Sequence, residues 1–169
     1  MNVNLKISER FYSYVLDWDY TKYLIIGGYG SGKSQSTAQK IILKLLQEKR
    51  TCLVVRNVFA TIKDSCFKLL EDIVIDMDLI GTSEREMDGI VFIKSPMEVR
   101  FPNGSRIIFR GMDNKEKIKS IHGVSIVWIE ECSEINVDAY NELIGRVRQP
   151  NTTLPVSYTH LTLPTKLEV

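Results

Sequence analysis

Hydrophobic residues follow two spacings along the chain, one typical of buried strands and one of amphipathic helices. Apolar runs at 24–26, 51–55 and 124–129 predict strands. Apolar residues recur every three or four positions over 35–49 and 58–77, which predicts a helix after each of the first two strands. Because strand, helix and strand in this order form a β-α-β unit, the sequence predicts an α/β fold with a mostly parallel sheet.

The stretch 90–110 departs from this pattern. Three short β-type runs lie at 90–93, 97–101 and 105–109. Asn103-Gly104 between the last two is a strong hairpin signal. We therefore expect an antiparallel β insertion near 90–110.

The first apolar run ends in a glycine-rich turn that carries the clearest chemical signal. It fits the pattern G-x-x-x-x-G-K-[ST] of a phosphate-binding loop. Backbone N–H groups can wrap a triphosphate only where side chains do not block the approach, and glycine permits both the closeness and the positive φ angles. Lys33 would place its charge on the β- and γ-phosphates, and Ser34 would offer its hydroxyl to Mg²⁺. The predicted nucleotide-binding residues are Gly27, Gly28, Tyr29, Gly30, Ser31, Gly32, Lys33, Ser34 and Gln35.

Two further helices are expected, one before the glycine-rich turn and one after the last apolar run. Helical spacing over 132–149 predicts one of them. The other is a short amphipathic helix over 8–18 that we expect to cover the edge of the sheet. Alternatively, one of its aromatic side chains stacks on a nucleotide base. The expected apolar side consists of Phe11, Tyr12, Val15 and Leu16.

A second acidic signal complements the phosphate loop. The apolar run from Val124 ends in Glu130 and Glu131. Two carboxylates at a strand end are usually surface residues, but together with a phosphate loop they have the form of a Walker B strand. Glu130, which stands where aspartate is commoner, would hold Mg²⁺, and Glu131 would polarise the water that attacks the γ-phosphate. We therefore predict Glu131 and Lys33 as catalytic residues, and Ser34 and Glu130 as the metal-side residues.

Composition narrows the class of protein further. The 169 residues carry a net charge of +1, with 44% apolar and 25% charged residues, as in an ordinary globular domain. Any surface that binds DNA must therefore be local. Cys52, Cys66 and Cys132 lack metal-ligand spacing and suggest a reducing cytoplasm, while His122 and His160 are too far apart for a familiar zinc site. No apolar run is near the roughly 18 residues of a membrane span, and no signal peptide is evident.

Several basic residues are candidates for contacts to DNA or for an arginine finger that reaches the nucleotide of a neighbouring subunit. One follows the second predicted strand, at the sheet edge where ligands bind in α/β folds. Two lie in a locally basic stretch and two near the end of the last predicted helix. Each is also compatible with an ordinary surface charge. They are Arg56, Lys117, Lys119, Arg146 and Arg148.

Four segments together resemble the large terminase subunit of tailed bacteriophages, of the PBSX type. The phosphate loop is shared by many NTPases, whereas Lys-Ser-Ile-x-Gly followed by Trp-Ile-Glu-Glu is more particular to this family. The resemblance covers about residues 10–153. The segments are 27–34, 101–111, 117–123 and 128–134.

The resemblance implies a P-loop NTPase of RecA-like, three-layer architecture that hydrolyses ATP with Mg²⁺. It implies a motor that packs double-stranded DNA into a capsid as a homo-oligomeric ring, with a small terminase subunit and a portal protein as partners, in the cytoplasm of the host bacterium. By position, Lys33, Ser34, Glu130 and Glu131 take the roles given above. Family members often have arginine where this chain has Tyr29, so another arginine is needed if that residue acts on the γ-phosphate.

The end of the chain departs from the family. We interpret 1–155 as the ATPase domain, incomplete at its end, and 156–169 as a tail that is not native to the gene and derives from an adaptor sequence. The resemblance implies that a strand following the Walker B strand lies between it and the phosphate-loop strand. Loss of that strand would leave a gap that the β-prone stretch 158–163 could fill. No nuclease carboxylate cluster is present, so the nuclease domain of the family is expected to be absent.

Two alternatives remain open at this point. One is a small-molecule kinase, although an arginine-rich lid is not apparent. The other is a truncated nucleotide-binding remnant that binds without turnover.

Overall fold

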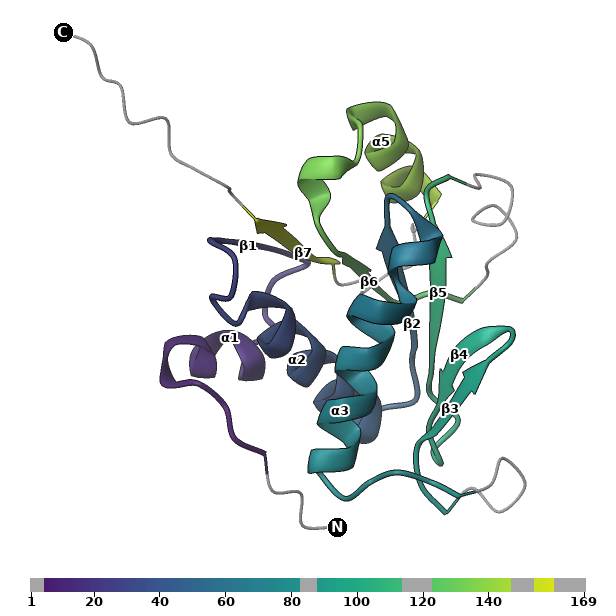
Figure 1. The fold of residues 1–169 in the computed structure, drawn as a ribbon. Helices are drawn as coiled ribbons and strands as arrows, with labels where there is room; N and C mark the ends of the chain where they lie inside the picture. Colours follow the sequence, from purple (N-terminus) through teal and green to yellow (C-terminus); the bar gives the residue numbers. More distant parts are fainter. Residues whose placement is uncertain (1–4, 83–87, 114–122, 147–153, 160–169) are drawn as a thin grey trace, which may run out of the picture.

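The computed structural model describes residues 5–82, 88–113, 123–146 and 154–159 (Figure 1). The strands are β1 (Lys22–Gly27), β2 (Thr51–Arg56), β3 (Val91–Lys94), β4 (Met97–Arg100), β5 (Arg106–Gly111), β6 (Ile126–Ile129) and β7 (Leu154–Thr159). The α-helices are α1 (Tyr12–Leu16), α2 (Lys33–Gln47), α3 (Lys68–Asp76) and α5 (Val137–Arg146). Short turns η1 (Glu9–Phe11), η2 (Phe59–Thr61) and η4 (Cys132–Glu134) are 3₁₀-helical, and η3 (Lys63–Phe67) is π-helical.

The described strands form one sheet, in the order β1-β7-β6-β2-β5-β4-β3. The first five in this order run parallel, which confirms the predicted α/β class. The antiparallel insertion expected near 90–110 is confirmed, since β4 pairs antiparallel with both β3 and β5. Only β3 and β4 are antiparallel additions among the described strands, because β5 pairs in parallel with β2 on one side and antiparallel with β4 on the other.

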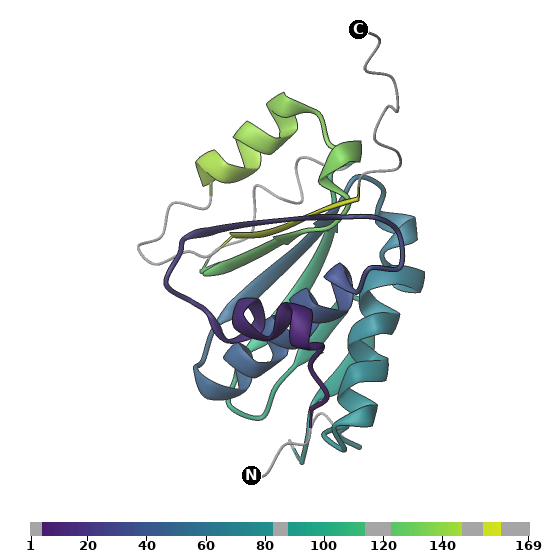
Figure 2. The ribbon, with the colours of Figure 1, turned by 90° about the vertical axis from the view of Figure 1, so that its left-hand side faces the viewer.

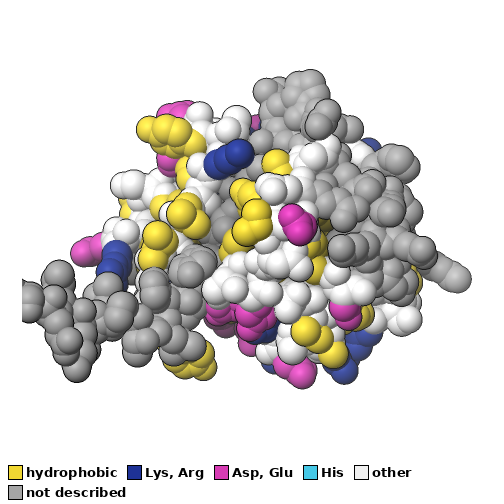
Figure 3. All heavy atoms as spheres, turned by 90° about the horizontal axis from the view of Figure 1, so that it is seen from above, with side chains coloured by type: hydrophobic (Ala, Val, Ile, Leu, Met, Phe, Trp, Pro, Cys, Tyr) yellow, Lys and Arg dark blue, Asp and Glu magenta, His cyan; other side chains and the backbone are white. Residues whose placement is uncertain are grey.

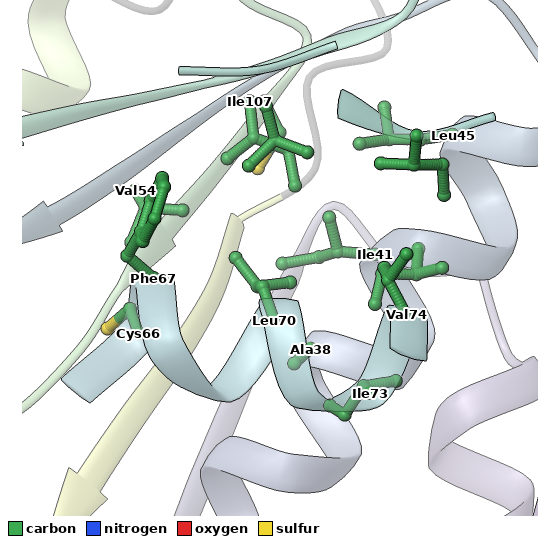
Figure 4. Packing of buried hydrophobic residues seen from close by; sticks show 14 of the residues in the cluster. Ala38, Ile41, Leu45, Val54, Cys66, Phe67, Leu70, Ile73, Val74 and Ile107 are labelled. Atoms are coloured by element: carbon green, nitrogen blue, oxygen red, sulfur yellow. The ribbon is translucent and has the colours of Figure 1, made fainter. Parts of the chain in front are cut away.

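Helices cover both faces of the sheet and make three layers (Figures 1 and 2). On one face, α2 and α3 pack against β2 and β5, as Figure 4 shows for Ala38, Ile41, Leu70, Val54 and Ile107. On the other face, α5 covers β2 and β6 through a smaller cluster. That cluster comprises Leu53, Val55, Ile108, Met112, Val124, Val127, Ile129, Ala139 and Leu143. The sheet is therefore buried from both sides at its centre, where apolar runs without alternation are expected.

Two helix predictions need correction. The helix expected over 58–77 is divided into η2, η3 and α3, and the π-helical turn of η3 lies in its middle. In the N-terminal helix, Val15 is buried, whereas Tyr12 and Leu16 are 56% and 51% exposed. The predicted apolar side was therefore wrong for these two residues, because a five-residue helix presents only one narrow side to α2.

The strand β7 occupies the position between β1 and β6 where a gap was expected. Its register pairs Leu24 with Val156, and Ile129 also pairs with Val156. The strand begins at Leu154 rather than at Tyr158, so the stretch that fills the gap is not the one we expected. Because β7 connects its neighbours, the backbone groups of β1 and β6 have a partner strand at the centre of the sheet.

The strand β1 lies at the edge of the described sheet and exposes apolar side chains. Tyr23 and Ile25 are buried, whereas Leu24 and Ile26 are 66% and 62% exposed. Seen from above, hydrophobic side chains are visible at several places on the surface of the molecule (Figure 3). Exposed apolar edge strands are prone to association with other strands.

Candidate nucleotide-binding site

The glycine-rich turn connects β1 to α2 and needs glycine at specific positions. Gly30 and Gly32 have φ angles of 69° and 87°, a region that other L-residues rarely adopt. At Gly27, a Cβ atom would lie 2.9 Å from the Ser31 hydroxyl oxygen. Gly32 also caps α2, since its carbonyl accepts the Ser36 amide at 2.9 Å. The loop therefore leads directly to a helix N-terminus, which favours bound anions.

Lys33 folds back over the loop to which it belongs. Its ammonium group donates to the Gly28 carbonyl oxygen at 2.8 Å and to the Ser31 hydroxyl oxygen at 3.2 Å. The residue is buried, with 5% of its surface exposed. The loop thus carries its positive charge at its own centre, where the phosphates of a nucleotide would be enclosed.

Ser34 and Glu130 are brought into direct contact. The Ser34 hydroxyl donates to Oε1 of Glu130 at 2.5 Å, although β7 separates β1 from β6 in the sheet. Glu130 is buried, and its amide donates to the Val55 carbonyl at 2.9 Å, which continues the pairing of β6 with β2. The other carboxylate oxygen, Oε2, accepts the Trp128 indole N–H at 2.9 Å.

Glu131 follows in a left-handed backbone conformation, with φ 52° and ψ 56°. This conformation is uncommon for residues other than glycine, asparagine and aspartate. It ends the strand and turns the chain into η4, where the Glu134 amide donates to the Glu131 carbonyl at 2.9 Å. Strained backbone of this kind is typical of functional sites.

The negative charge of Glu130 influences neighbouring groups. Burial raises the pKa of the Cys66 thiol to about 12, with the Glu130 charge as a smaller cause in the same direction. Burial likewise raises the pKa of Tyr14, again with a smaller contribution from Glu130. Since Glu130 contacts Ser34 on α2 and Trp128 in the core formed with α2 and α3, the carboxylate lies on the side of the sheet that these helices cover.

The residues present fit a magnesium ion. Mg²⁺ prefers oxygen ligands and is usually bound by one or two carboxylates together with waters and substrate phosphates. The Ser34 hydroxyl and the Glu130 carboxylate are such ligands, and they are already in contact with each other. In the part of the chain that the structure describes, no group of three or more His, Cys, Asp or Glu could hold a metal ion. Ions at this position would need phosphate oxygens or waters to complete their coordination.

Other predicted loop residues lie away from this contact. Tyr29 is 92% exposed at the outer side of the loop. Gln35 is exposed and lines a pocket of about 370 Å³ with Gln39, Ile73 and other residues of the N-terminal segment, α2 and α3. Among the aromatic residues of the N-terminal helix, Phe11 reaches the loop, where its ring lies 3.6 Å from the position of a Cβ at Gly32.

Of the basic candidates, the structure places Arg56 near the site. Its Nε lies 3.9 Å from Oε2 of Glu134, on the turn that follows Glu131. Arg146 ends α5, and nothing is described of its side chain. Lys117, Lys119 and Arg148 lie outside the described residues.

Sequence reasoning missed one residue that contacts the site and one buried charge away from it. Trp128 was assigned to the apolar run and to the segment 128–134 of the family resemblance, but not to a contact with Glu130. Residues two apart in a strand share a face, and this signal could have linked the two side chains. Lys40 was treated as part of an amphipathic helix, but it is completely buried on α2. Nothing in its local sequence distinguishes it from the other lysines of that helix.

The chain is similar to phage terminase large subunits over most of its length. A family model described as "Phage terminase large subunit" matches residues 20–162. The chain is 47% identical over 149 residues to the PBSX phage terminase large subunit of Bacillus subtilis (strain 168), covering 88% of this chain and 33% of that protein. It is 36% identical over 146 residues to the terminase large subunit of Bacillus phage SPP1, covering 79% of this chain and 33% of that one. The chain thus spans about a third of the length of these relatives.

Solved structures show the same fold at low sequence identity. The large terminase of a thermophilic bacteriophage superposes with a TM-score of 0.74 at 9% identity, over 91% of this chain and 39% of that chain. The ATPase domain of the Thermus phage P74-26 large terminase superposes with a TM-score of 0.64 at 12% identity, over 95% of this chain and 72% of that chain. These likenesses confirm the predicted P-loop NTPase fold of RecA-like type. With the family model matching most of its length, the chain belongs to the phage terminase large subunit family.

Proposed function

We propose that this chain is the ATP-hydrolysing motor domain of a phage terminase large subunit, which drives double-stranded DNA into a capsid. The contact between Ser34 and Glu130 beside the Lys33 loop carries the proposal, because it joins the two halves of a triphosphate site. Structures of the thermophilic-phage large terminase in complex with ADP and with ATP-gamma-S have the same fold and support a nucleotide ligand.

The loop residues would bind the nucleotide. The Lys33 ammonium would exchange the Gly28 carbonyl and the Ser31 hydroxyl for oxygens of the β- and γ-phosphates. Backbone N–H groups from Gly27 to Gln35 and the N-terminus of α2 would add further donors. Tyr29, which is almost fully exposed, contributes its backbone to this loop rather than an enclosed side chain.

The acidic residues would serve the chemical step. Ser34 and Glu130 would hold Mg²⁺, and the bound ion supplies positive charge that neutralises the phosphates. Glu131, at the turn that follows the strand, would act as the base that orients the attacking water. The left-handed backbone at Glu131 directs the chain away from β6, so that the two neighbouring carboxylates can take different roles.

We also propose the assembly in which this domain works, on the basis of family membership. We expect a homo-oligomeric ring on the capsid that works with a small terminase subunit and a portal protein in the cytoplasm of the host cell. Arg146 or Arg148 would be the arginine finger, and Lys117, Lys119 and Arg56 would contact DNA or phosphate. No described helix is long and apolar enough to cross a membrane. We further propose that 1–155 belongs to the ATPase domain and that 156–169 is a tail foreign to the gene. Residues 156–159 of this tail complete β7, and the family model also matches as far as residue 162.

The experiment is a measurement of ATP hydrolysis with and without double-stranded DNA. We expect stimulation in the wild-type chain and loss of hydrolysis in Lys33→Ala and in Glu131→Gln, while Glu131→Gln still binds ATP. Lys63→Ala, at an exposed lysine on η3, is the matched control and should hydrolyse ATP normally.

Other outcomes contradict the proposal in distinct ways. Stimulated hydrolysis that neither variant alters would show that this site is not responsible. Tight nucleotide binding without any hydrolysis would indicate a remnant without turnover. Phosphate transfer to a small acceptor instead of water would indicate a kinase.

A further inference from the structure

The side chain of Trp128 lies beneath the acidic end of β6. It is completely buried in the core formed with α2 and α3. Trp128 and Glu130 are two positions apart, so they extend from the same face of the strand. The indole N–H donates to Oε2 of Glu130 at 2.9 Å.

The two oxygens of the Glu130 carboxylate therefore have different partners. Oε1 accepts the Ser34 hydroxyl at 2.5 Å, and Oε2 accepts the Trp128 indole at 2.9 Å. Hydrogen bonds to an ionised carboxylate are stronger than neutral ones, particularly where water is excluded. With one oxygen held from the core, the other is directed toward the phosphate loop.

We propose that Trp128 is a positioning residue that orients the Glu130 carboxylate toward Ser34 and the cation that these two residues would share. The proposal rests on the proposed function for the role of that cation. An indole ring is rigid and packed on all sides here, so its N–H is a donor at a fixed place.

The same pair accounts for glutamate at a position where aspartate is commoner. An aspartate carboxylate would be set back by about one C–C bond, roughly 1.5 Å. It would then be unable to contact the Trp128 indole and the Ser34 hydroxyl at their present distances. The Trp128 donor thus selects the longer acid.

The hydrogen bond can be tested on the protein without nucleotide. The chain has two tryptophans, so ¹⁵N-labelled protein gives two indole N–H signals, which Trp18→Phe assigns. We expect Glu130→Gln to shift the Trp128 signal and speed its hydrogen exchange, and Glu131→Gln to leave it nearly unchanged. Addition of Mg²⁺ and ADP should also shift it. A Trp128 signal that is indifferent to Glu130→Gln would overturn the proposal, whatever the outcome of the hydrolysis assay.

The positioning role is tested by the magnesium dependence of ATP hydrolysis. Trp128→Phe removes the donor and keeps an aromatic ring, and Trp18→Phe is the matched control elsewhere. Loss of a group that supports a metal ligand typically weakens metal affinity by about 10- to 100-fold. We expect the Mg²⁺ concentration for half-maximal rate to rise by about 10-fold in Trp128→Phe, with unchanged ATP binding in the absence of Mg²⁺.

A purely structural role for Trp128 predicts a different pattern. In that case Trp128→Phe would lower stability and the maximal rate, while the magnesium dependence stayed that of the wild type. A Glu130→Asp background separates the positioning role from the structural role further, because the Trp128 indole has lost its contact with the carboxylate in that background. We expect Trp128→Phe to add little to the magnesium requirement of Glu130→Asp. If Trp128→Phe raised the magnesium requirement equally in the wild-type and Glu130→Asp backgrounds, the result would contradict positioning. If Trp128→Phe fails to fold, the NMR comparison of Glu130→Gln with Glu131→Gln still tests the proposal.

Discussion

The Ser34 hydroxyl and the Glu130 carboxylate are joined by a hydrogen bond of 2.5 Å across 96 positions of sequence. One residue lies in the first turn of the helix after β1, and the other follows β6. Parallel strands bring their carboxyl ends to the same edge of the sheet, so residues that follow two such strands can meet there. The contact brings the helix that follows the glycine-rich loop and the acidic end of β6 together at this edge.

Removal of the Ser34 hydroxyl is expected to weaken the magnesium-dependent part of nucleotide binding. In Ser34→Ala, we expect the affinity for ADP to fall by about 10-fold when Mg²⁺ is present and to change little when it is chelated. Titration with a fluorescent ADP analogue measures both conditions. Ser13→Ala, at an exposed serine of α1, is the control. Equal losses with and without Mg²⁺ would show that the hydroxyl supports the loop rather than the ion.

Arg56 is expected to lower the stability of the fold while it serves the function. Within the described part of the chain, the buried Nε atoms of Arg56 and Arg110 have no hydrogen-bond partner. Both residues are half-buried, and among the described residues Arg56 keeps only the distant Glu134 carboxylate as an ionic partner. A buried N–H without a hydrogen bond costs free energy, and replacement of such a group by an apolar one of similar length is often neutral or stabilising. We therefore expect Arg56→Met and Arg110→Met each to keep or raise the midpoint of urea denaturation.

The two arginine variants should differ in activity. Arg56 lies beside the turn that follows Glu131, whereas Arg110 lies on β5, and burial lowers its pKa. We expect at least a several-fold loss of DNA-stimulated ATP hydrolysis in Arg56→Met and little change in Arg110→Met. Similar activities of both variants would remove Arg56 from the list of functional residues.

Lys40 is expected to make stability depend on pH in the alkaline range. Its ammonium group donates to the carbonyl oxygens of Tyr14 and Asp17, and it lies 4.2 Å from the ring centroids of Trp18 and Tyr23. Burial lowers its pKa from 10.5 to about 8, and the charge of Asp17 opposes this shift in part. The folded chain therefore loses this proton at lower pH than the unfolded chain.

The sign of the effect follows from proton binding. Between about pH 8 and 10.5 the unfolded chain holds more protons at Lys40, so this group makes the free energy of unfolding rise with pH, by at most about 1.4 kcal/mol per unit. Lys44 lowers the pKa of Lys40 slightly, and burial raises the pKa of Tyr14 and Tyr23, which opposes the trend above about pH 10. Urea denaturation of the wild type and of Lys40→Met isolates the contribution of Lys40. Parallel curves for the two proteins would contradict a lowered pKa.

Gly111 is expected to tolerate no side chain. It ends β5, and a Cβ atom there would lie 2.6 Å from the backbone nitrogen of Phe59 on η2. Gly111→Ala should lower the free energy of unfolding by about 3 kcal/mol, because backbone must move to make room. At Gly145, no described atom lies within 4 Å of such a Cβ, so Gly145→Ala in α5 should be neutral or stabilising by about 0.5 kcal/mol. Chemical denaturation distinguishes them, and equal effects would contradict the close approach.

Features that depend on a few neighbouring residues could be read from the sequence. The loop from Gly27 to Ser34 follows from torsion preferences that glycine alone satisfies, and α2 follows from its helical period. The acidic strand end at Glu130 was equally visible, since an apolar run that stops at two carboxylates is a local pattern. These elements and their order were enough to predict the fold class and the candidate site.

Only the tertiary structure decided which distant segments are neighbours. Local sequence cannot show that β5 pairs with β2, or that Leu154 rather than Tyr158 begins the strand between β1 and β6. It also placed Tyr12 on the buried side of a helix that is too short to bury it, and it passed over the indole donor that Trp128 offers to Glu130. The physical reason is that periodicity and torsion preference act within a few residues. Pairing and burial depend on free energies shared between parts of the chain that meet only on folding.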